Sequence, residues 1–131
     1  MQLRTSFPPV AASAGDARRL VRGALAEWGL SAAEEETALL LLTELMSNGV
    51  RHAKTELHVL LTYDGFRIHV GVSDGDQHPA ALTEATPTPH RGWGLRLVDL
   101  LSSDWGTITE RHGKTVWFDL DVAERPGLVR A

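Results

Sequence analysis

Four polar residues in the middle of this 131-residue chain are spaced so that they could act on a phosphate group. Glu44 and Asn48 are four residues apart, and Arg51 and His52 follow about one helical turn later. At the α-helical period these side chains share one face of a helix. A carboxylate can orient a nucleophile, an amide oxygen can ligate Mg²⁺, and a guanidinium can hold phosphate.

The alternative for this face is ordinary solvated helix surface, which is where most charged side chains lie. Two residues on or beside this face favour a functional role. Asn48 is a poor residue for the middle of a helix, and Gly49 beside it costs up to about 1 kcal/mol relative to alanine. Gly49 therefore predicts the close approach of another group.

Two further motifs lie where an expected strand ends and where an expected helix begins. Asp74 and Gly75 close an alternating strand, and a carboxylate there accepts hydrogen bonds only, so it would select an amino donor such as the exocyclic amine of adenine. The alternative is a simple Asp-Gly turn. A second motif comprises Gly92, Trp93, Gly94 and Leu95. It opens a helix whose backbone N–H groups suit an anion, although by itself it is equally typical of a loop-to-helix junction.

A fourth candidate is Thr115, in the alternating run 113–118. Its hydroxyl could line a ligand pocket, or the run could be only a strand. Six histidines are present, but they form no zinc-type spacing, and the chain contains neither a phosphate-binding loop of the G-x4-G-K-[ST] type nor a G-x-S-x-G elbow.

The helices and strands that must position these residues can be read from the periodicity of the sequence. Helices are expected at 13–29, capped by Ser13, at 32–52, opened by a Ser31–Glu34 capping box, and at 92–103. Strands are expected at 2–7, 56–63, 66–73, 105–111 and 115–121, with an Asp64-Gly65 hairpin turn. Tight hairpins imply a largely antiparallel sheet, and three amphipathic helices need one face of it. This predicts an α+β fold, a two-layer sandwich, in one domain at 1–122 with a C-terminal tail at 123–131.

Composition narrows the class of protein. The chain carries 13 Lys and Arg against 17 Asp and Glu, a formal net charge of -4, and no cysteine. The absence of cysteine excludes a disulfide scaffold and a cysteine nucleophile. Mild acidity argues against direct nucleic-acid binding. No signal peptide or membrane-spanning run is visible, so no membrane association is expected and a cytoplasmic protein is the default expectation.

Taken together, the motifs resemble those of the GHKL ATPase superfamily. The run 44–53 resembles its asparagine-bearing box. The segments 73–75, 92–95 and 113–115 are similar to its first, second and third glycine-containing boxes. The likeness spans about residues 2–121 and is greatest to stand-alone anti-sigma-factor serine/threonine kinases. It implies the Bergerat fold, with a mixed, mainly antiparallel sheet, helices on one face and ATP as cofactor.

The resemblance also implies a role for each residue. Asn48 would bind Mg²⁺, and Glu44 would be the catalytic residue that activates the attacking hydroxyl. Asp74, beside Gly75, would accept from the adenine amine, supported by Thr115 through water. The remaining residues would contact the phosphates or close the pocket: Arg51, His52, Gly92, Trp93, Gly94 and Leu95. The family pattern Asp-x-Gly-x-Gly is altered after Gly75, where Asp76, Gln77 and His78 follow.

The function expected from the resemblance is an ATP- and Mg²⁺-dependent protein serine/threonine kinase of the anti-sigma type. It would phosphorylate or sequester a protein partner, a sigma factor or its anti-anti-sigma-like antagonist. Two alternatives remain open. One is an interaction module with weak or no catalysis. The other is a histidine kinase-like catalytic domain that acts on a separate protein. A homodimer is a further family-level expectation.

Overall fold

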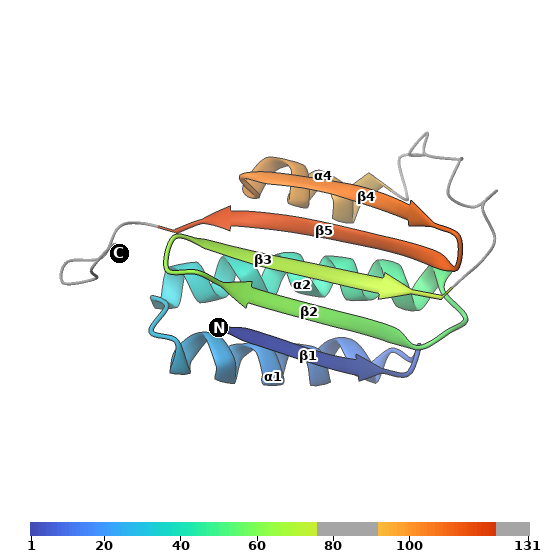
Figure 1. Cartoon of the computed structure of the whole chain (residues 1–131), viewed down its shortest axis with the longest axis horizontal. Coiled ribbons are helices and arrows are strands. Elements are labelled where there is room, and N and C mark those ends of the chain that lie inside the picture. Colours follow the sequence, from blue (N-terminus) through green and yellow to red (C-terminus); the bar gives the residue numbers. More distant parts are fainter. Residues whose placement is uncertain (76–91, 123–131) are drawn as a thin grey trace.

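Helical periodicity and strand alternation build two layers, with the helices packed on one face of a sheet (Figure 1). The computed structural model describes residues 1–75 and 92–122, without the side chains of 92–94. Described helices are α1 (Ala12–Glu27), α2 (Ala32–His52) and α4 (Gly92–Leu101). Described strands are β1 (Gln2–Phe7), β2 (Leu57–Tyr63), β3 (Arg67–Asp74), β4 (Asp104–Glu110) and β5 (Gly113–Asp121). The α+β two-layer prediction is confirmed. The tail predicted at 123–131 lies outside the described residues.

The described strands form one sheet in the order β1-β2-β3-β5-β4, and every neighbouring pair in it is antiparallel. β5 therefore lies between β3 and β4, although β4 precedes it in the chain. This crossover places β5 inside the sheet, directly against the central strand β3. In the part of the chain that the structure describes, no helix is long and apolar enough to cross a membrane.

The core lies between the sheet and the helices. Its largest fully buried side chains come from α1, α2 and the inward faces of β2, β3 and β5: Phe118, Leu25, Leu41, Leu42, Leu45, Met46, Leu57, Leu61, Ile68, Val21, Val59 and Val70. Gly49 of α2 allows the helix to approach β2. A β-carbon at that position would lie 3.0 Å from Leu57 Cδ2 and 3.2 Å from Cδ1. The close approach that Gly49 predicts is therefore contact with Leu57.

The two helix starts differ in how well the sequence predicts them. At α2 the Ser31 side chain accepts from the backbone N–H of Glu34, and the Glu34 carboxylate accepts from that of Ser31, so the capping box is confirmed. At α1 the Ser13 cap is wrong, because the helix begins at Ala12 without a side-chain cap. The buried Ser13 hydroxyl instead donates to the carbonyl of Pro8 at 2.6 Å, which ties the helix start to the end of β1.

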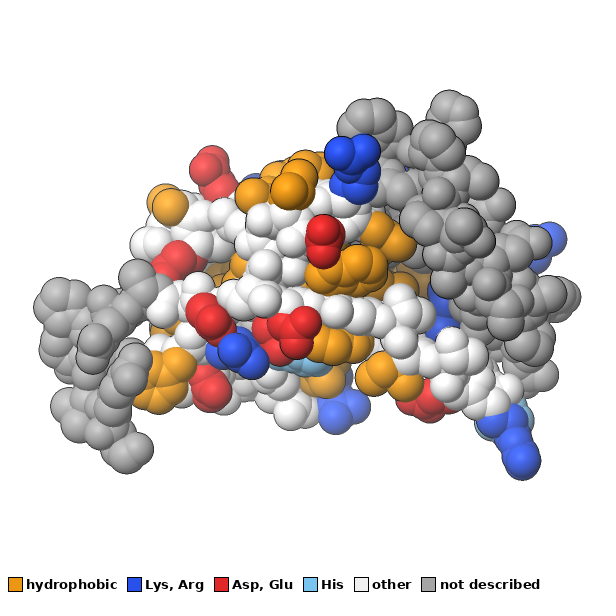
Figure 2. Space-filling model, turned by 90° about the horizontal axis from the view of Figure 1, so that it is seen from above, with side chains coloured by type: hydrophobic (Ala, Val, Ile, Leu, Met, Phe, Trp, Pro, Cys, Tyr) orange, Lys and Arg blue, Asp and Glu red, His pale blue; other side chains and the backbone are white. Residues whose placement is uncertain are grey.

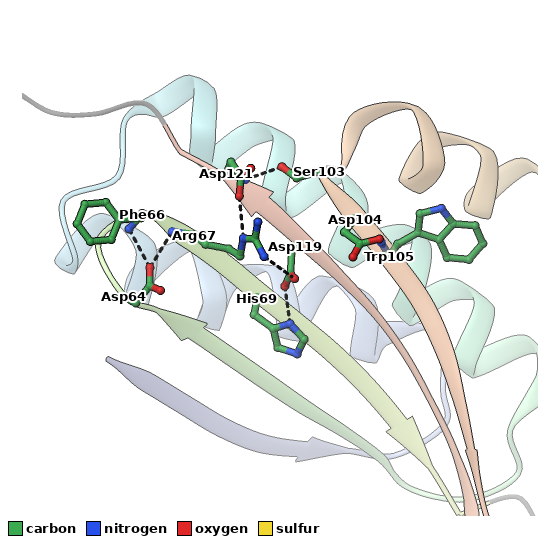
Figure 3. Close-up of polar contacts among 9 residues, drawn as sticks. All are labelled: Asp64, Phe66, Arg67, His69, Ser103, Asp104, Trp105, Asp119 and Asp121. Carbon is green, nitrogen blue, oxygen red and sulfur yellow. Dashed lines mark hydrogen bonds and ion pairs between the residues drawn. The ribbon is translucent and has the colours of Figure 1, made fainter.

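On the open face of the sheet, charged side chains cross-link β3 and β5 (Figure 3). Arg67 Nε donates to Asp121 Oδ1 at 2.7 Å, and His69 Nδ1 lies 2.6 Å from Asp119 Oδ1. Hydrogen bonding to Asp121 raises the pKa of Arg67. Trp117 lies beside His69, with ring centroids 5.7 Å apart. These contacts join β3 and β5 at the end far from Asp74, in the observed register.

The turn between β2 and β3 is held by a carboxylate. Asp64 Oδ1 accepts from the backbone N–H groups of Phe66 at 2.9 Å and Arg67 at 2.8 Å (Figure 3). Gly65 supplies the positive φ, 97°, that the turn requires. The hydrogen bond from Phe66, followed by that from Arg67, lowers the pKa of Asp64 below its ordinary value of 3.8.

We expect Asp64→Asn to flatten the acid limb of the stability curve. Because the folded pKa is lowered, the charged Asp64 stabilises the fold above about pH 4, and this contribution is lost as the pH falls through the lowered pKa. Asparagine can still accept both hydrogen bonds but does not titrate. Urea unfolding between pH 7 and pH 2.5 measures the difference. Glu27→Gln, at an exposed position of α1, is the control. Identical acid limbs for Asp64→Asn and wild type would contradict the assignment.

Candidate functional site

Four segments that carry the predicted site residues meet at one end of the molecule (Figure 1). Antiparallel register places Leu57 opposite Asp74, and Asp74 opposite Lys114. α2 ends at His52, only a short connection before Leu57, and α4 begins at the same end of the sheet. The backbone N–H of Gly75 donates to Thr55 Oγ1 at 2.8 Å, which fastens the end of β3 to the connection that follows α2.

The polar face of α2 is not an ordinary solvated surface. α2 packs against β2, β3, β5, α1 and α4. Of the four predicted residues, Glu44, Asn48 and His52 are half-buried, and only Arg51 is exposed. The carboxylate and the amide, one turn apart, therefore lie partly enclosed in the protein. His52 makes a polar or ring contact of its own.

Asp74 is the last residue of β3 and is buried. Its side chain shares the helix-facing side of the sheet with Val70 and Val72, as strand alternation requires. Opposite it, Lys114 Nζ lies 3.6 Å from Asp74 Oδ2. The side chain of Lys114 is only 9% exposed and that of Asp74 only 4%. A charged pair is thus enclosed at the point where an adenine-binding carboxylate is predicted.

Thr115 lies on the other face of the sheet. Its hydroxyl shares a 2.6 Å hydrogen bond with the hydroxyl of Ser73, the residue opposite it in the register. The structure therefore does not bring Thr115 to Asp74, and it brings Lys114 there instead. The signal was present in the sequence: Val116 and Phe118 are inward-facing, so a period of two places residue 114, and not 115, on their face.

Gly113 allows the start of β5 to touch the end of β3. Its φ is 153°, and a β-carbon there would lie 1.9 Å from the carbonyl oxygen of Asp74. No other residue type fits without moving the backbone that carries Asp74. Glycine is thus a structural requirement of the site.

The second glycine motif opens a helix, as its position predicts. α4 begins at Gly92, and Leu95 is partly buried against the core. For Gly92, Trp93 and Gly94 only the backbone helix is described. The altered segment after Gly75, with Asp76, Gln77 and His78, also lies outside the described residues.

Comparison with known proteins agrees with the motifs and the topology. A family model for the histidine kinase-like ATPase domain matches residues 7–120. Among solved structures, the RsbU and RsbW domains of Rv1364c from Mycobacterium tuberculosis match with a TM-score of 0.72 at 19% sequence identity. That alignment covers 95% of this chain and 34% of the other. No curated protein sequence matches. The findings confirm the resemblance to the GHKL superfamily and the fold.

We expect Gly113→Ala to destabilise the protein and to displace Asp74. Both the positive φ and the overlap with the Asp74 carbonyl oppose a methyl group, so the free energy of unfolding should fall by about 2 kcal/mol or more. Thermal and urea unfolding measure it. Gly23→Ala is the matched control, because nothing lies within 4 Å of a β-carbon at that helical position. Equal stability of the two variants would contradict the close contact.

Proposed function

Because the chain belongs to the histidine kinase-like ATPase domain family, we propose that it binds ATP with Mg²⁺ and is a protein serine/threonine kinase of the anti-sigma type. The observation that supports the proposal is that β3, which ends in the buried Asp74 carboxylate, packs against α2, the helix that carries the half-buried Glu44 and Asn48. A ligand that offers an amine at one end and phosphates at the other suits these groups.

The donor set fits a nucleotide and its metal. In this proposal, Asp74 accepts from the exocyclic amine of adenine, beside Gly75. Asn48 provides an amide oxygen of the kind that Mg²⁺ accepts, and Mg²⁺ usually takes its remaining ligands from phosphates and water. The metal neutralises charge that develops on the phosphates during transfer. Helix α4 begins at Gly92 near the same end, where its first N–H groups suit an anion.

In this proposal, Glu44 accepts the proton of the attacking serine or threonine hydroxyl, which a carboxylate placed one turn from the metal ligand is suited to do. Arg51 and His52 lie at the end of α2 and contact phosphate or close the pocket. Gly92, Trp93, Gly94 and Leu95 contribute backbone N–H groups. Thr115 lies behind the site, on the open face, so Lys114 takes the place beside Asp74.

The proposed partner is another protein, a sigma factor or an anti-anti-sigma-like antagonist. The side of the molecule formed by α4 and β4 supports a protein contact, because apolar and acidic side chains mix there (Figure 2). Leu100, Leu101 and Ile108 are large apolar residues exposed on these elements. We also propose that this exposed apolar surface of α4 and β4 can serve as a homodimer interface.

An interaction module with weak catalysis is the second candidate function. The Lys114–Asp74 pair favours it, since the carboxylate that should receive the adenine amine already faces an ammonium group. In that case Glu44→Ala leaves partner binding and cellular function unchanged. A histidine kinase-like domain acting on a separate protein is the third, and the acid lability of phosphohistidine distinguishes its product from phosphoserine.

We expect the purified protein to bind Mg-ATP, as measured by isothermal titration calorimetry, and Asn48→Ala to weaken that binding at least tenfold only when Mg²⁺ is present. Ser47→Ala, the preceding half-buried polar residue on α2, is the matched control. No heat of binding at millimolar ATP, from protein with native circular dichroism, would refute the proposal.

We expect Glu44→Ala to keep ATP affinity within a few-fold and to reduce phosphoryl transfer to the partner by roughly 10²–10⁴-fold, the usual contribution of a general base. Transfer is followed by phosphosite mapping after incubation with a partner recovered from the source cell. Glu27→Ala is the control carboxylate. Unchanged transfer by the Glu44 variant would remove it from the catalytic role.

A further inference from the structure

Lys114 is a buried lysine for which the proposed function has no task. It lies on the helix-facing side of β5, opposite Asp74 and beside Val116. Its ammonium nitrogen is 3.6 Å from the carboxylate, and its side chain is 9% exposed. Lysine is almost never buried to this extent unless it is paired, so both its burial and its direction are set by this one site.

An ammonium group beside a carboxylate can select a ligand more specifically than a carboxylate alone. Asp74 offers acceptors only, and the Lys114 ammonium offers donors only. The pair therefore matches a ligand edge that carries a donor next to an acceptor. The Watson–Crick edge of adenine is such an edge: its exocyclic amine donates, and the neighbouring ring nitrogen N1 accepts.

We propose that Lys114 reads the base, donating a hydrogen bond to adenine N1 while Asp74 accepts from the exocyclic amine. The inference rests on the proposed binding of ATP. The side chain that contacts N1 directly is then Lys114, and Thr115, whose hydroxyl bonds Ser73 on the open face, has no part in base recognition. In guanine the same two positions carry an acceptor, O6, and a donor, N1–H. Guanine in this orientation would therefore place an acceptor against Asp74 and a donor against Lys114.

The test uses an analogue that lacks only the N1 acceptor, 1-deaza-ATP. Calorimetry with the full-length protein compares the dissociation constants for ATP and 1-deaza-ATP in wild type, Lys114→Met and Lys54→Met. Lys54 is the matched control because it is the only other lysine in the chain and is exposed. A hydrogen bond from a charged donor predicts that wild type and Lys54→Met bind 1-deaza-ATP roughly ten- to hundredfold more weakly than ATP. Lys114→Met should bind the two nucleotides about equally.

Lys114→Met leaves a buried carboxylate without its ammonium partner, which could cost the variant its fold. The double variant Asp74→Asn with Lys114→Met removes both charges and still accepts through the amide oxygen, and the ratio of the two dissociation constants is again expected to approach one. Lys114→Arg, which keeps a charged donor, should retain a preference for ATP. A merely structural lysine would not give this dependence on N1.

The outcomes separate the two levels of the proposal. Equal affinity of wild type for ATP and 1-deaza-ATP overturns the base-reading role and leaves ATP binding in place. An undiminished preference for ATP in folded Lys114→Met, or in the double variant Asp74→Asn with Lys114→Met, also overturns it. No binding of ATP by wild type overturns the proposed function and this inference together.

Discussion

The pairing of β3 with β5 is the interaction on which the rest of the structure depends. These strands are distant in the chain, yet they are neighbours inside the sheet, and the candidate site depends on their register. At one end, Arg67 and His69 bind Asp121 and Asp119 on the open face. At the other end, Asp74 meets Lys114 on the helix face. If β5 slipped by one residue, Lys114, Asp119 and Asp121 would turn to the face opposite their partners on β3.

The same register explains why the site lies at one end of the molecule. The positive φ of Gly113 permits backbone contact with Asp74, so β5 begins where β3 ends. Thr55 then links Gly75 to the connection after α2. Three segments from different parts of the chain are thereby fixed around one carboxylate, and Gly49 allows α2 to pack closely against Leu57 at the start of β2. The contacts that pack these segments together therefore also determine the geometry of the candidate site.

Much of this could be predicted from the sequence, for reasons that are local. The capping box at Ser31, the Asp64 turn and the alternation of β2 each depend on residues a few positions apart, and they gave element bounds close to those observed. What failed depends on distant neighbours. Ser13 resembles a helix cap until the Pro8 carbonyl is placed beside it. Thr115 resembles a pocket residue until the register of β5 against β3 assigns its face. Sequence reasoning missed Lys114 because the motif was matched by residue type, while the inward face was determined by Val116 and Phe118.

The buried pair at the site is hard to explain by stability alone. Removing two charges from water costs free energy that their attraction only partly returns, and an apolar pair of similar volume is often as stable or more so. On the open face the fold uses charge differently: Arg67 and Asp121 remain about half exposed, so their pairing costs little desolvation and also contributes little. In the proposed function, a bound nucleotide would supply the buried ammonium and carboxylate with hydrogen bonds in place of those that water made. The net charge of -4 therefore says little about the site, because its chemistry is set by which few charges the strand register encloses.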